Sequence, residues 1–402
     1  MFCKPSHLAA LFLSACLSTL APAVASTLDP AQRTHAFTIA SKALDEERTV
    51  YVRAPAEDDS GGTYPVVYVL DAEWNFEYVA AYIENLVENG AYPPMVVTGI
   101  VNINRNRDYV PRADRHFPHT GEADRFLDFV ATEWIPQVEE RFAGSGRRVL
   151  VGHSFGGVFT LHTLFTRPGL FDAYLAMGSS AWIADRVLFD EAEALFESGA
   201  NPNAFVWMAV GENDGGPTIP SGKDLAALFE LKAPAGLEWT FSITPRTDHV
   251  TNFISGTHAA FMALFPSFGF DRELTTRARL QGAAGVDAWF AEKEASLGWR
   301  FQPAWFDLGV TAMTLAREPA TAEAARSLTA QLRRYFPDNA FIAFYSATVY
   351  EQSGMLAEAL AEAERAITLA EEQRLDPNEL QIETLESSRE RIREALAANA
   401  SS

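Results

Sequence analysis

The sequence predicts an α/β fold, a mainly parallel sheet covered by helices on both faces, followed by an all-α region. Strand-like and helix-like segments alternate from Thr27 to about Pro266, and repeated strand-helix units build sheets of this kind. Beyond Phe270 the strand signals stop and helical segments follow one another. A chain of 402 residues is long enough for two such domains.

The first 25 residues have the pattern of an export signal. Lys4 forms a short basic region, Leu8 to Leu20 are mostly apolar, and Ala23-Val24-Ala25 before Ser26 fits a cleavage site. We therefore expect a signal peptide over residues 1–25 and a periplasmic or secreted mature protein. Leu13-Ser14-Ala15-Cys16 also resembles a bacterial lipobox, so a lipoprotein anchored through Cys16 is the alternative.

Cysteine and charge content argue against several classes of function. Both cysteines, Cys3 and Cys16, lie in the leader, so a mature chain starting at Ser26 has neither a disulfide nor a thiol nucleophile. The chain has 53 acidic and 32 basic residues and a net charge of -21. That charge argues against nucleic acids and anionic membrane surfaces as partners.

The strands expected in the first domain begin with an antiparallel pair and continue as apolar runs typical of buried parallel strands. They are His35 to Ala40, Arg48 to Arg53, Tyr64 to Leu70, Met95 to Val101, the run from Arg148 to Val151, Ala173 to Met177, Ala204 to Val210 and Leu237 to Ile243. Helices are expected between them, including Phe76 to Val87, Glu122 to Phe142 and Gly157 to Phe165.

The last third of the chain contains a series of helical patterns with partial matches to the tetratricopeptide repeat. Trp305-x-x-Leu308-Gly309 fits the start of that repeat, and Tyr350, Gly354, Ala359 and Ala366 fit its later spacing. An ordinary helical bundle is the alternative. The expected helices are Asp287 to Leu297, Pro303 to Arg317, Thr321 to Tyr335, Phe341 to Ser353, Leu356 to Glu371 and Pro377 to Ala398.

The candidate nucleophile is Ser154 in Gly152-His153-Ser154-Phe155-Gly156. This motif lies between an apolar run and a helix-forming segment. A serine on a tight strand-to-helix turn exposes its hydroxyl near free backbone N–H groups, and small flanking residues leave the necessary clearance. Because Gly and Ser are common residues, the motif alone is weak evidence, and its strand-helix context carries the prediction.

His249 is the expected general base. In the α/β-hydrolase order an acid and then a histidine follow the serine, which leaves His162, His249 and His258 as candidates. His249 comes directly after the last expected strand, where a loop can bring the imidazole over the sheet edge. The other two lie within expected helices, so we interpret them as structural.

Asp214 is the expected acid. Gly211-Glu212-Asn213-Asp214-Gly215 follows the strand that ends near Val210. Its carboxylate would hold the imidazole tautomer and stabilise the imidazolium. Asp214 is favoured over Glu212, and a solvated turn is the alternative for this segment.

The expected oxyanion hole consists of two backbone N–H groups. One is that of Phe155, directly after the nucleophile, and the other is that of Glu73 in the turn Leu70-Asp71-Ala72-Glu73 after a central strand.

Four segments together resemble a known family. They are Tyr64 to Asp71, Arg105 to Pro111, Gly152 to Gly157 and Arg167 to Tyr174. They look like the putative-esterase group of α/β-hydrolases, which includes siderophore esterases, feruloyl esterases, S-formylglutathione hydrolases and mycolyltransferases, with the siderophore branch the most similar. The resemblance covers about Thr27 to Pro266. It implies an α/β-hydrolase fold with Ser154, His249 and Asp214 as nucleophile, base and acid.

The sequence departs from the family pattern at two places. Ala72 stands where the family usually has glycine, and Gly178-Ser179-Ser180-Ala181-Trp182 replaces a Ser-Pro-Ser-x-Trp segment that lines the acyl site. From these motifs we expect His153, Trp182 and Arg107 to contact the substrate. Some siderophore esterases are described as using a Ser-His dyad, which leaves the importance of Asp214 open.

The sequence therefore predicts an exported serine ester hydrolase over residues 26–270 and a tetratricopeptide-like domain over residues 271–402. We expect a small-molecule ester substrate and no cofactor. No metal site is expected at His116 and His119, whose segment lacks organised acidic or histidine partners. The C-terminal helices are candidates for binding a protein partner. Acyl transfer, peptide hydrolysis and an inactive hydrolase fold that serves as an interaction protein are the alternatives.

Overall fold

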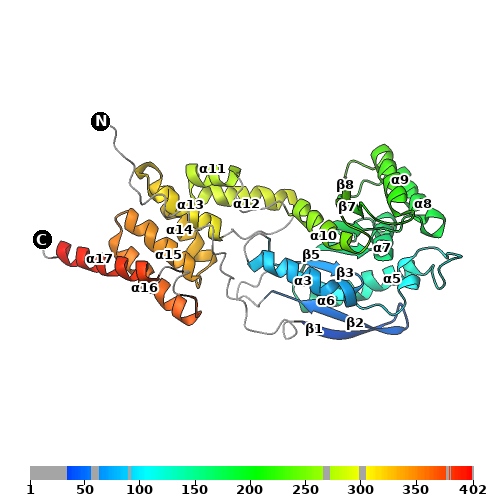
Figure 1. Cartoon of the computed structure of the whole chain (residues 1–402), viewed down its shortest axis with the longest axis horizontal. Helices are drawn as coiled ribbons and strands as arrows, with labels where there is room; N and C mark the ends of the chain where they lie inside the picture. Colours follow the sequence, from blue (N-terminus) through cyan, green and yellow to red (C-terminus); the bar gives the residue numbers. More distant parts are fainter. Residues whose placement is uncertain are drawn as a thin grey trace. The chain divides into compact units, whose positions relative to one another are not determined.

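The computed structural model describes residues 34–55, 63–88, 92–265, 272–297, 305–376, 380 and 382–400 (Figure 1). The chain divides into two compact units, each of which is considered by itself below. The first consists mainly of the described residues up to 265, and the second mainly of those after 271. The expected signal peptide, the lipobox and both cysteines lie outside the described residues.

The first unit contains an eight-stranded sheet in the order β1-β2-β4-β3-β5-β6-β7-β8. β1 pairs antiparallel with β2, and β2 pairs antiparallel with β4, whereas every pair from β4 to β8 is parallel. The predicted mainly parallel sheet with an antiparallel opening pair is thus confirmed. The strands are β1 (His35–Ser41), β2 (Glu46–Arg53), β3 (Tyr64–Val69), β4 (Val96–Ile100), β5 (Gly144–His153), β6 (Ala173–Met177), β7 (Ala204–Gly211) and β8 (Leu237–Thr244).

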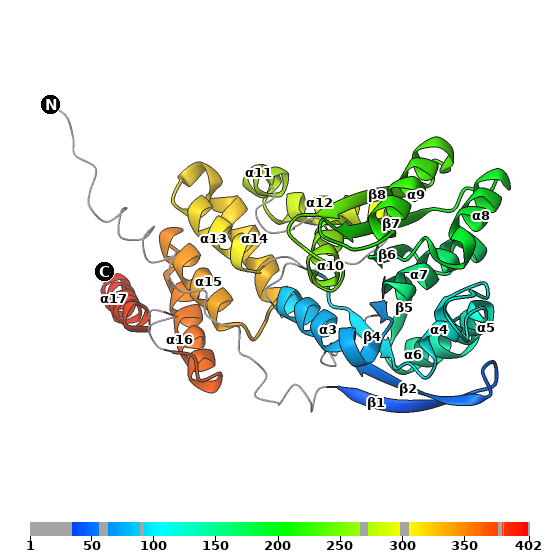
Figure 2. The ribbon, with the colours of Figure 1, turned by 45° about the vertical axis from the view of Figure 1, so that its right-hand side comes forward.

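Helices cover both faces of this sheet, as the sequence predicts. Figure 2 shows α3 and α10 on one face and α6, α7 and α8 on the other. Strands covered on both sides need apolar residues throughout, and Val66 to Val69 are completely buried. The helices are α3 (Ala72–Glu88), α4 (Arg105–Tyr109), α5 (Ala123–Phe129), α6 (Ile135–Arg141), α7 (Phe155–Thr166), α8 (Ile183–Glu197), α9 (Thr218–Lys232) and α10 (Thr251–Leu264).

The parallel strands bring the predicted site residues to one edge of the sheet. The carboxyl ends of parallel strands lie at the same edge, which is where open α/β sheets bind ligands. The turn that leads to Glu73 follows β3, Ser154 follows β5, Asp214 follows β7 and His249 follows β8. The strand order of the sheet therefore brings residues that are far apart in the sequence close together in space.

The predicted helix from Glu122 to Phe142 is not a single α-helix. It consists of α5, a π-helical turn at Val130–Trp134 and α6. Pro136 has no N–H to donate, and its ring excludes the carbonyl of the residue four positions earlier. The N–H of Ile135 bonds instead to Val130 O, five residues back, so the proline accounts for the wider turn.

The described part of the second unit consists of helices. One close approach depends on glycine, because a Cβ at Gly309 of α13 would lie 2.2 Å from the Tyr345 ring of α15. One helix, α11, was not among those expected, since few apolar residues mark a face on it. The helices are α11 (Arg272–Gln281), α12 (Ala283–Leu297), α13 (Trp305–Ala316), α14 (Ala322–Tyr335), α15 (Ala340–Gln352), α16 (Leu356–Glu372) and α17 (Ile382–Ala400), with a 3-10 turn at Pro319–Thr321.

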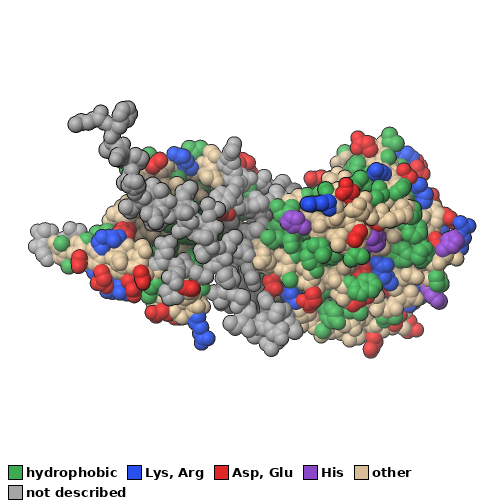
Figure 3. All heavy atoms as spheres, in the orientation of Figure 1, with side chains coloured by type: hydrophobic (Ala, Val, Ile, Leu, Met, Phe, Trp, Pro, Cys, Tyr) green, Lys and Arg blue, Asp and Glu red, His purple; other side chains and the backbone are tan. Residues whose placement is uncertain are grey.

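The surface of the first unit is mixed in character. On the face that Figure 3 presents, hydrophobic side chains gather between interspersed acidic and basic ones, so the described part of this face has no continuous patch of one charge sign. Across the described ranges, no helix combines the length and apolar character that a membrane crossing requires.

Candidate active site

Ser154 lies on a sharp turn between β5 and α7. Its backbone has φ 59° and ψ −116°, a conformation that non-glycine residues seldom adopt. The turn also needs small neighbours, because a Cβ at Gly152 would lie 2.2 Å from Gly156 O. The sequence therefore forms the strand-turn-helix geometry that presents a serine hydroxyl at the edge of a sheet.

His249 and Asp214 form a hydrogen-bonded pair. His249 Nδ1 lies 3.0 and 3.1 Å from the two carboxylate oxygens of Asp214, whose side chain is only 2% exposed. An ionised carboxylate only accepts hydrogen bonds, so Nδ1 carries the proton in this pair. A neutral imidazole then has its lone pair on Nε2, which is the form a general base needs.

A hydrogen bond from His153 links the turn at Ser154 to the loop that carries His249. Its Nε2 lies 2.7 Å from His249 O, and the two imidazole rings are 4.7 Å apart between centroids. A carbonyl oxygen only accepts, so Nε2 of His153 is the donor. Burial, together with the adjacent His249, lowers the pKa of His153 to about 4 and keeps this side chain neutral.

Ser154 and His249 both line a pocket of about 420 Å³. Aromatic and aliphatic side chains form most of its wall, and Trp74 at the pocket is 68% exposed. Such a wall fits an apolar or aromatic group of a ligand. The lining residues are Trp74, Asn75, Tyr78, Arg105, His153, Ser154, His249, Val250, Phe253 and Ile254.

The two expected oxyanion donors are at the starts of helices. Phe155 is the first residue of α7, and Glu73 is the second residue of α3. The first four N–H groups of an α-helix have no acceptor within the helix, and the helix dipole makes this end partly positive. Neither N–H group has an acceptor within its own helix, so each can donate to an oxygen that gains negative charge.

The remaining candidates for the base and the acid have other partners. His162 is buried in α7, with Nδ1 3.0 Å from the Glu191 carboxylate, and His258 Nδ1 lies 2.9 Å from the Tyr82 hydroxyl. Glu212 accepts a hydrogen bond from the N–H of Arg246.

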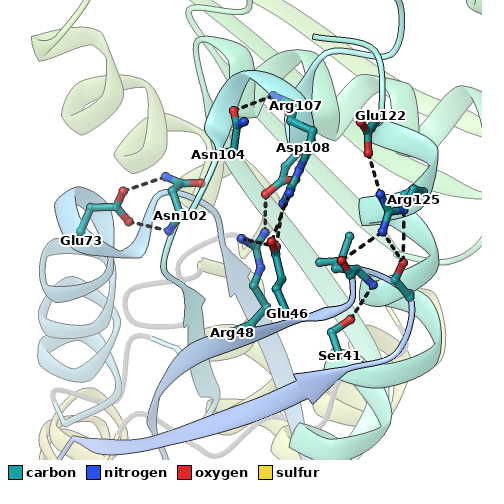
Figure 4. Close-up of polar contacts among 12 residues, drawn as sticks. Ser41, Glu46, Arg48, Glu73, Asn102, Asn104, Arg107, Asp108, Glu122 and Arg125 are labelled. Atoms are coloured by element: carbon teal, nitrogen blue, oxygen red, sulfur yellow. Dashed lines mark hydrogen bonds and ion pairs between the residues drawn. The ribbon is translucent and has the colours of Figure 1, made fainter. Parts of the chain in front are cut away.

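Two of the three expected substrate contacts do not line the pocket. Of the three, His153 lines it. Trp182 packs against Phe117, with ring centroids 5.7 Å apart. Arg107 binds the Glu46 carboxylate at 2.6 Å and the Asp108 carboxylate at 2.7 Å (Figure 4). The arginine that lines the pocket is Arg105, two residues earlier in the same motif, which the sequence interpretation did not select.

Comparisons with known sequences identify esterase relatives. A family described as putative esterase matches residues 41–259. A siderophore enterobactin esterase of Emericella nidulans is 37% identical over 123 residues, 27% of this chain and 40% of that protein. A siderophore triacetylfusarinine C esterase of Aspergillus fumigatus is 44% identical over 80 residues, 19% of this chain and 27% of that protein. The aligned segments thus span less than half of each of these two relatives.

Solved structures share the fold. An IroE-like serine hydrolase from Shewanella oneidensis superposes with a TM-score of 0.63 and 26% identity, covering 75% of this chain and 99% of that one. The siderophore hydrolase EstB from Aspergillus nidulans, at 23% identity and a TM-score of 0.51, supports the fold alone over 59% of this chain and 96% of that one. The family match spans more than half of the sequence and contains every residue of the pocket. The chain therefore belongs to the putative-esterase family.

Proposed function

We propose that the protein is a carboxylic ester hydrolase that uses Ser154, His249 and Asp214 and passes through an acyl-enzyme. One observation carries this proposal. The loop after β8 pairs His249 with the buried Asp214 and also brings His249 into the pocket that Ser154 lines. A serine, an imidazole with the required tautomer and a buried carboxylate are the groups that this chemistry needs.

The proposed reaction has two halves. Ser154 Oγ attacks the ester carbonyl carbon while His249 Nε2 takes the hydroxyl proton. The carbonyl oxygen becomes negative and accepts hydrogen bonds from the N–H groups of Phe155 and Glu73. The imidazolium then gives its proton to the leaving alcohol as the carbon–oxygen bond of the ester breaks. In the second half, water attacks the acyl carbon while His249 takes its proton. The ester bond to Ser154 then breaks, Ser154 regains a proton from His249, and the carboxylic acid is released.

We propose siderophore-like esters with an aromatic group near the scissile bond as the substrate class. Two relatives are described as a siderophore enterobactin esterase and a ferri-bacillibactin esterase, the latter from Bacillus subtilis and 28% identical over 155 residues. The side chains of Trp74, Tyr78 and Phe253 give the pocket an aromatic wall, which offers stacking to such a group. A panel of aryl, feruloyl and catecholate esters tests this assignment.

The mechanism is tested with Ser154→Ala and His249→Ala. Each should lower kcat by about 10⁴-fold or more, because nucleophile and base act as a unit. The change at Ser154 opens no core cavity, so Tm should stay nearly unchanged. The measurement is steady-state hydrolysis of an aryl ester, with mass spectrometry to locate the adduct of a fluorophosphonate.

Matched controls are available in the same unit. Ser145→Ala changes an exposed serine near the start of β5, the strand that precedes Ser154, and His258→Ala changes a histidine bonded to Tyr82. Both should retain activity. Wild-type turnover by Ser154→Ala would eliminate the mechanism, and a larger loss in His258→Ala than in His249→Ala would identify a different base.

We also propose that residues 26–270 form the catalytic domain, that residues 271–402 form a tetratricopeptide-like domain that binds a protein partner, and that residues 1–25 export the protein. The leader pattern supports export. The division of the chain into two compact units and the Gly309–Tyr345 approach between helices support the domain assignment.

A further inference from the structure

Arg105 connects two turns of the candidate site. Its Nε donates to Asp71 Oδ1 at 2.7 Å, and its Nη2 donates to Asp71 Oδ2 at 3.0 Å and to His153 O at 2.8 Å. One guanidinium therefore links the turn after β3 to the last residue of β5, directly before the nucleophile. A planar, bidentate contact of this kind fixes orientation as well as distance.

Asp71 combines an unfavourable backbone conformation with a buried charge, and its contacts with Arg105 stabilise both. Its φ is 56°, in the left-handed region, and its side chain is 1% exposed. Its N–H donates to the Tyr109 hydroxyl at 3.2 Å, and a Cβ at Gly156 would lie 3.1 Å from Asp71 Oδ2. The carboxylate thus packs against the nucleophile turn and is too deeply buried to touch a substrate.

Asn102 forms hydrogen bonds with both Asp71 and Glu73. Its Nδ2 donates to Asp71 Oδ1 at 2.6 Å and to Glu73 Oε1 at 2.8 Å, and its backbone N–H donates to Glu73 Oε2 at 3.2 Å. Figure 4 shows Asn102 reaching the side chain of Glu73. Both ends of the segment Asp71 to Glu73, which carries the proposed second oxyanion donor, are therefore bonded to side chains that follow β4.

We propose that Arg105, acting through Asp71, is a positioning residue that holds the N–H of Glu73 at a fixed place relative to Ser154. The inference rests on the proposed acyl-enzyme mechanism. An oxyanion hole acts mainly in the transition state, so loosening it lowers kcat with little change in KM. A guanidinium that only bound the substrate would act on KM, and the buried Asp71 would then be unimportant.

The test compares Arg105→Gln, Asp71→Asn and the double variant with Ser154→Ala and wild type. Each single change should lower kcat about 10²-fold with KM changed by less than about threefold. The double variant should lose no more than the larger single loss, because both changes break the same link. Arg112→Gln is the matched control, since Arg112 pairs with Asp190 on the surface, and it should retain wild-type kcat.

The double variant also keeps the test valid if a single variant folds poorly. Arg105→Gln leaves the buried Asp71 carboxylate without its charged partner, which destabilises a protein strongly, whereas the double variant removes both charges. A folded double variant with wild-type kcat would overturn the inference, as would a rise in KM alone for Arg105→Gln with Asp71→Asn unaffected. If Ser154→Ala is inactive in those cases, only the positioning role fails. If it is active, the proposed mechanism fails.

Discussion

His153 is a neutral histidine held between two turns. Burial lowers its pKa to about 4, below the ordinary value of 6.5, and its Nε2–H bonds to His249 O. Between these two pH values the unfolded chain binds a proton that the folded chain does not. The stabilisation from His153 is therefore fully present above about pH 6.5 and is lost as pH falls toward 4.

We predict that His153→Gln weakens this acid sensitivity. Glutamine does not titrate, and its amide can also donate to His249 O. The difference in the free energy of unfolding between wild type and variant should change by up to about 1.4 kcal/mol per pH unit between pH 6.5 and 4. Above pH 7 that difference should be constant. Urea unfolding from pH 4.5 to 8 measures it, and parallel stability curves would contradict the prediction.

The turn after β6 sets the space available to both imidazoles. Gly178 has φ 54°, and a Cβ there would lie 3.2 Å from His153 Nε2 and 3.3 Å from His249 Nδ1. Gly178→Ala should therefore displace His249, the proposed base, and lower kcat by about 10-fold or more, since small misplacements in an active site are costly.

Gly199→Ala separates this effect from backbone strain. Gly199 also has a positive φ, 77°, but a Cβ there would meet nothing within 4 Å. Both variants should lose stability, by roughly 1 kcal/mol, because alanine is unfavourable at a positive φ. Only Gly178→Ala should lose kcat. Equal kcat in the two variants, measured with an aryl ester, would show that Gly178 does not position the base.

Local sequence patterns predict the helices and strands well, but they predict the side-chain contacts between these elements poorly. The strand, turn and helix around Ser154 are adjacent in sequence, so this turn is predictable from a local pattern. The strands follow from alternating polarity in the opening pair and from apolar runs in most of the others. The π-helical turn before Pro136 was missed, since periodicity does not reveal how a proline is accommodated. Arg105 was missed because its bonds to Asp71 and His153 depend on the order β4-β3-β5 of the sheet. The motif itself does not distinguish Arg105 from Arg107, which the sequence analysis predicts as the substrate contact.

In the molecule as a whole, the residues of the candidate active site all lie within one of the two compact units. The residues that line the pocket run from Trp74 to Ile254, and β8, the last strand described, ends at Thr244. Within the described ranges, the sheet is thus complete before α11, the first of the helices that make up most of the second unit. If the proposed triad is right, no group that acts on the ester bond is expected from the helices after residue 271.

We therefore predict that a chain ending at Asp271 keeps its activity on a small aryl ester. The expected result is a kcat within about threefold of the full chain, because the proposed nucleophile, base, acid and oxyanion donors are all retained. Circular dichroism and a thermal melt establish that the shortened chain folds, and hydrolysis is then measured on a small and a bulky ester. Retention of both activities would assign the helices to partner binding, whereas selective loss of the bulky ester would place them beside the substrate entrance. Loss of small-ester hydrolysis in a folded, shortened chain would show that a catalytic element lies beyond Asp271 and would refute the proposed division into two domains.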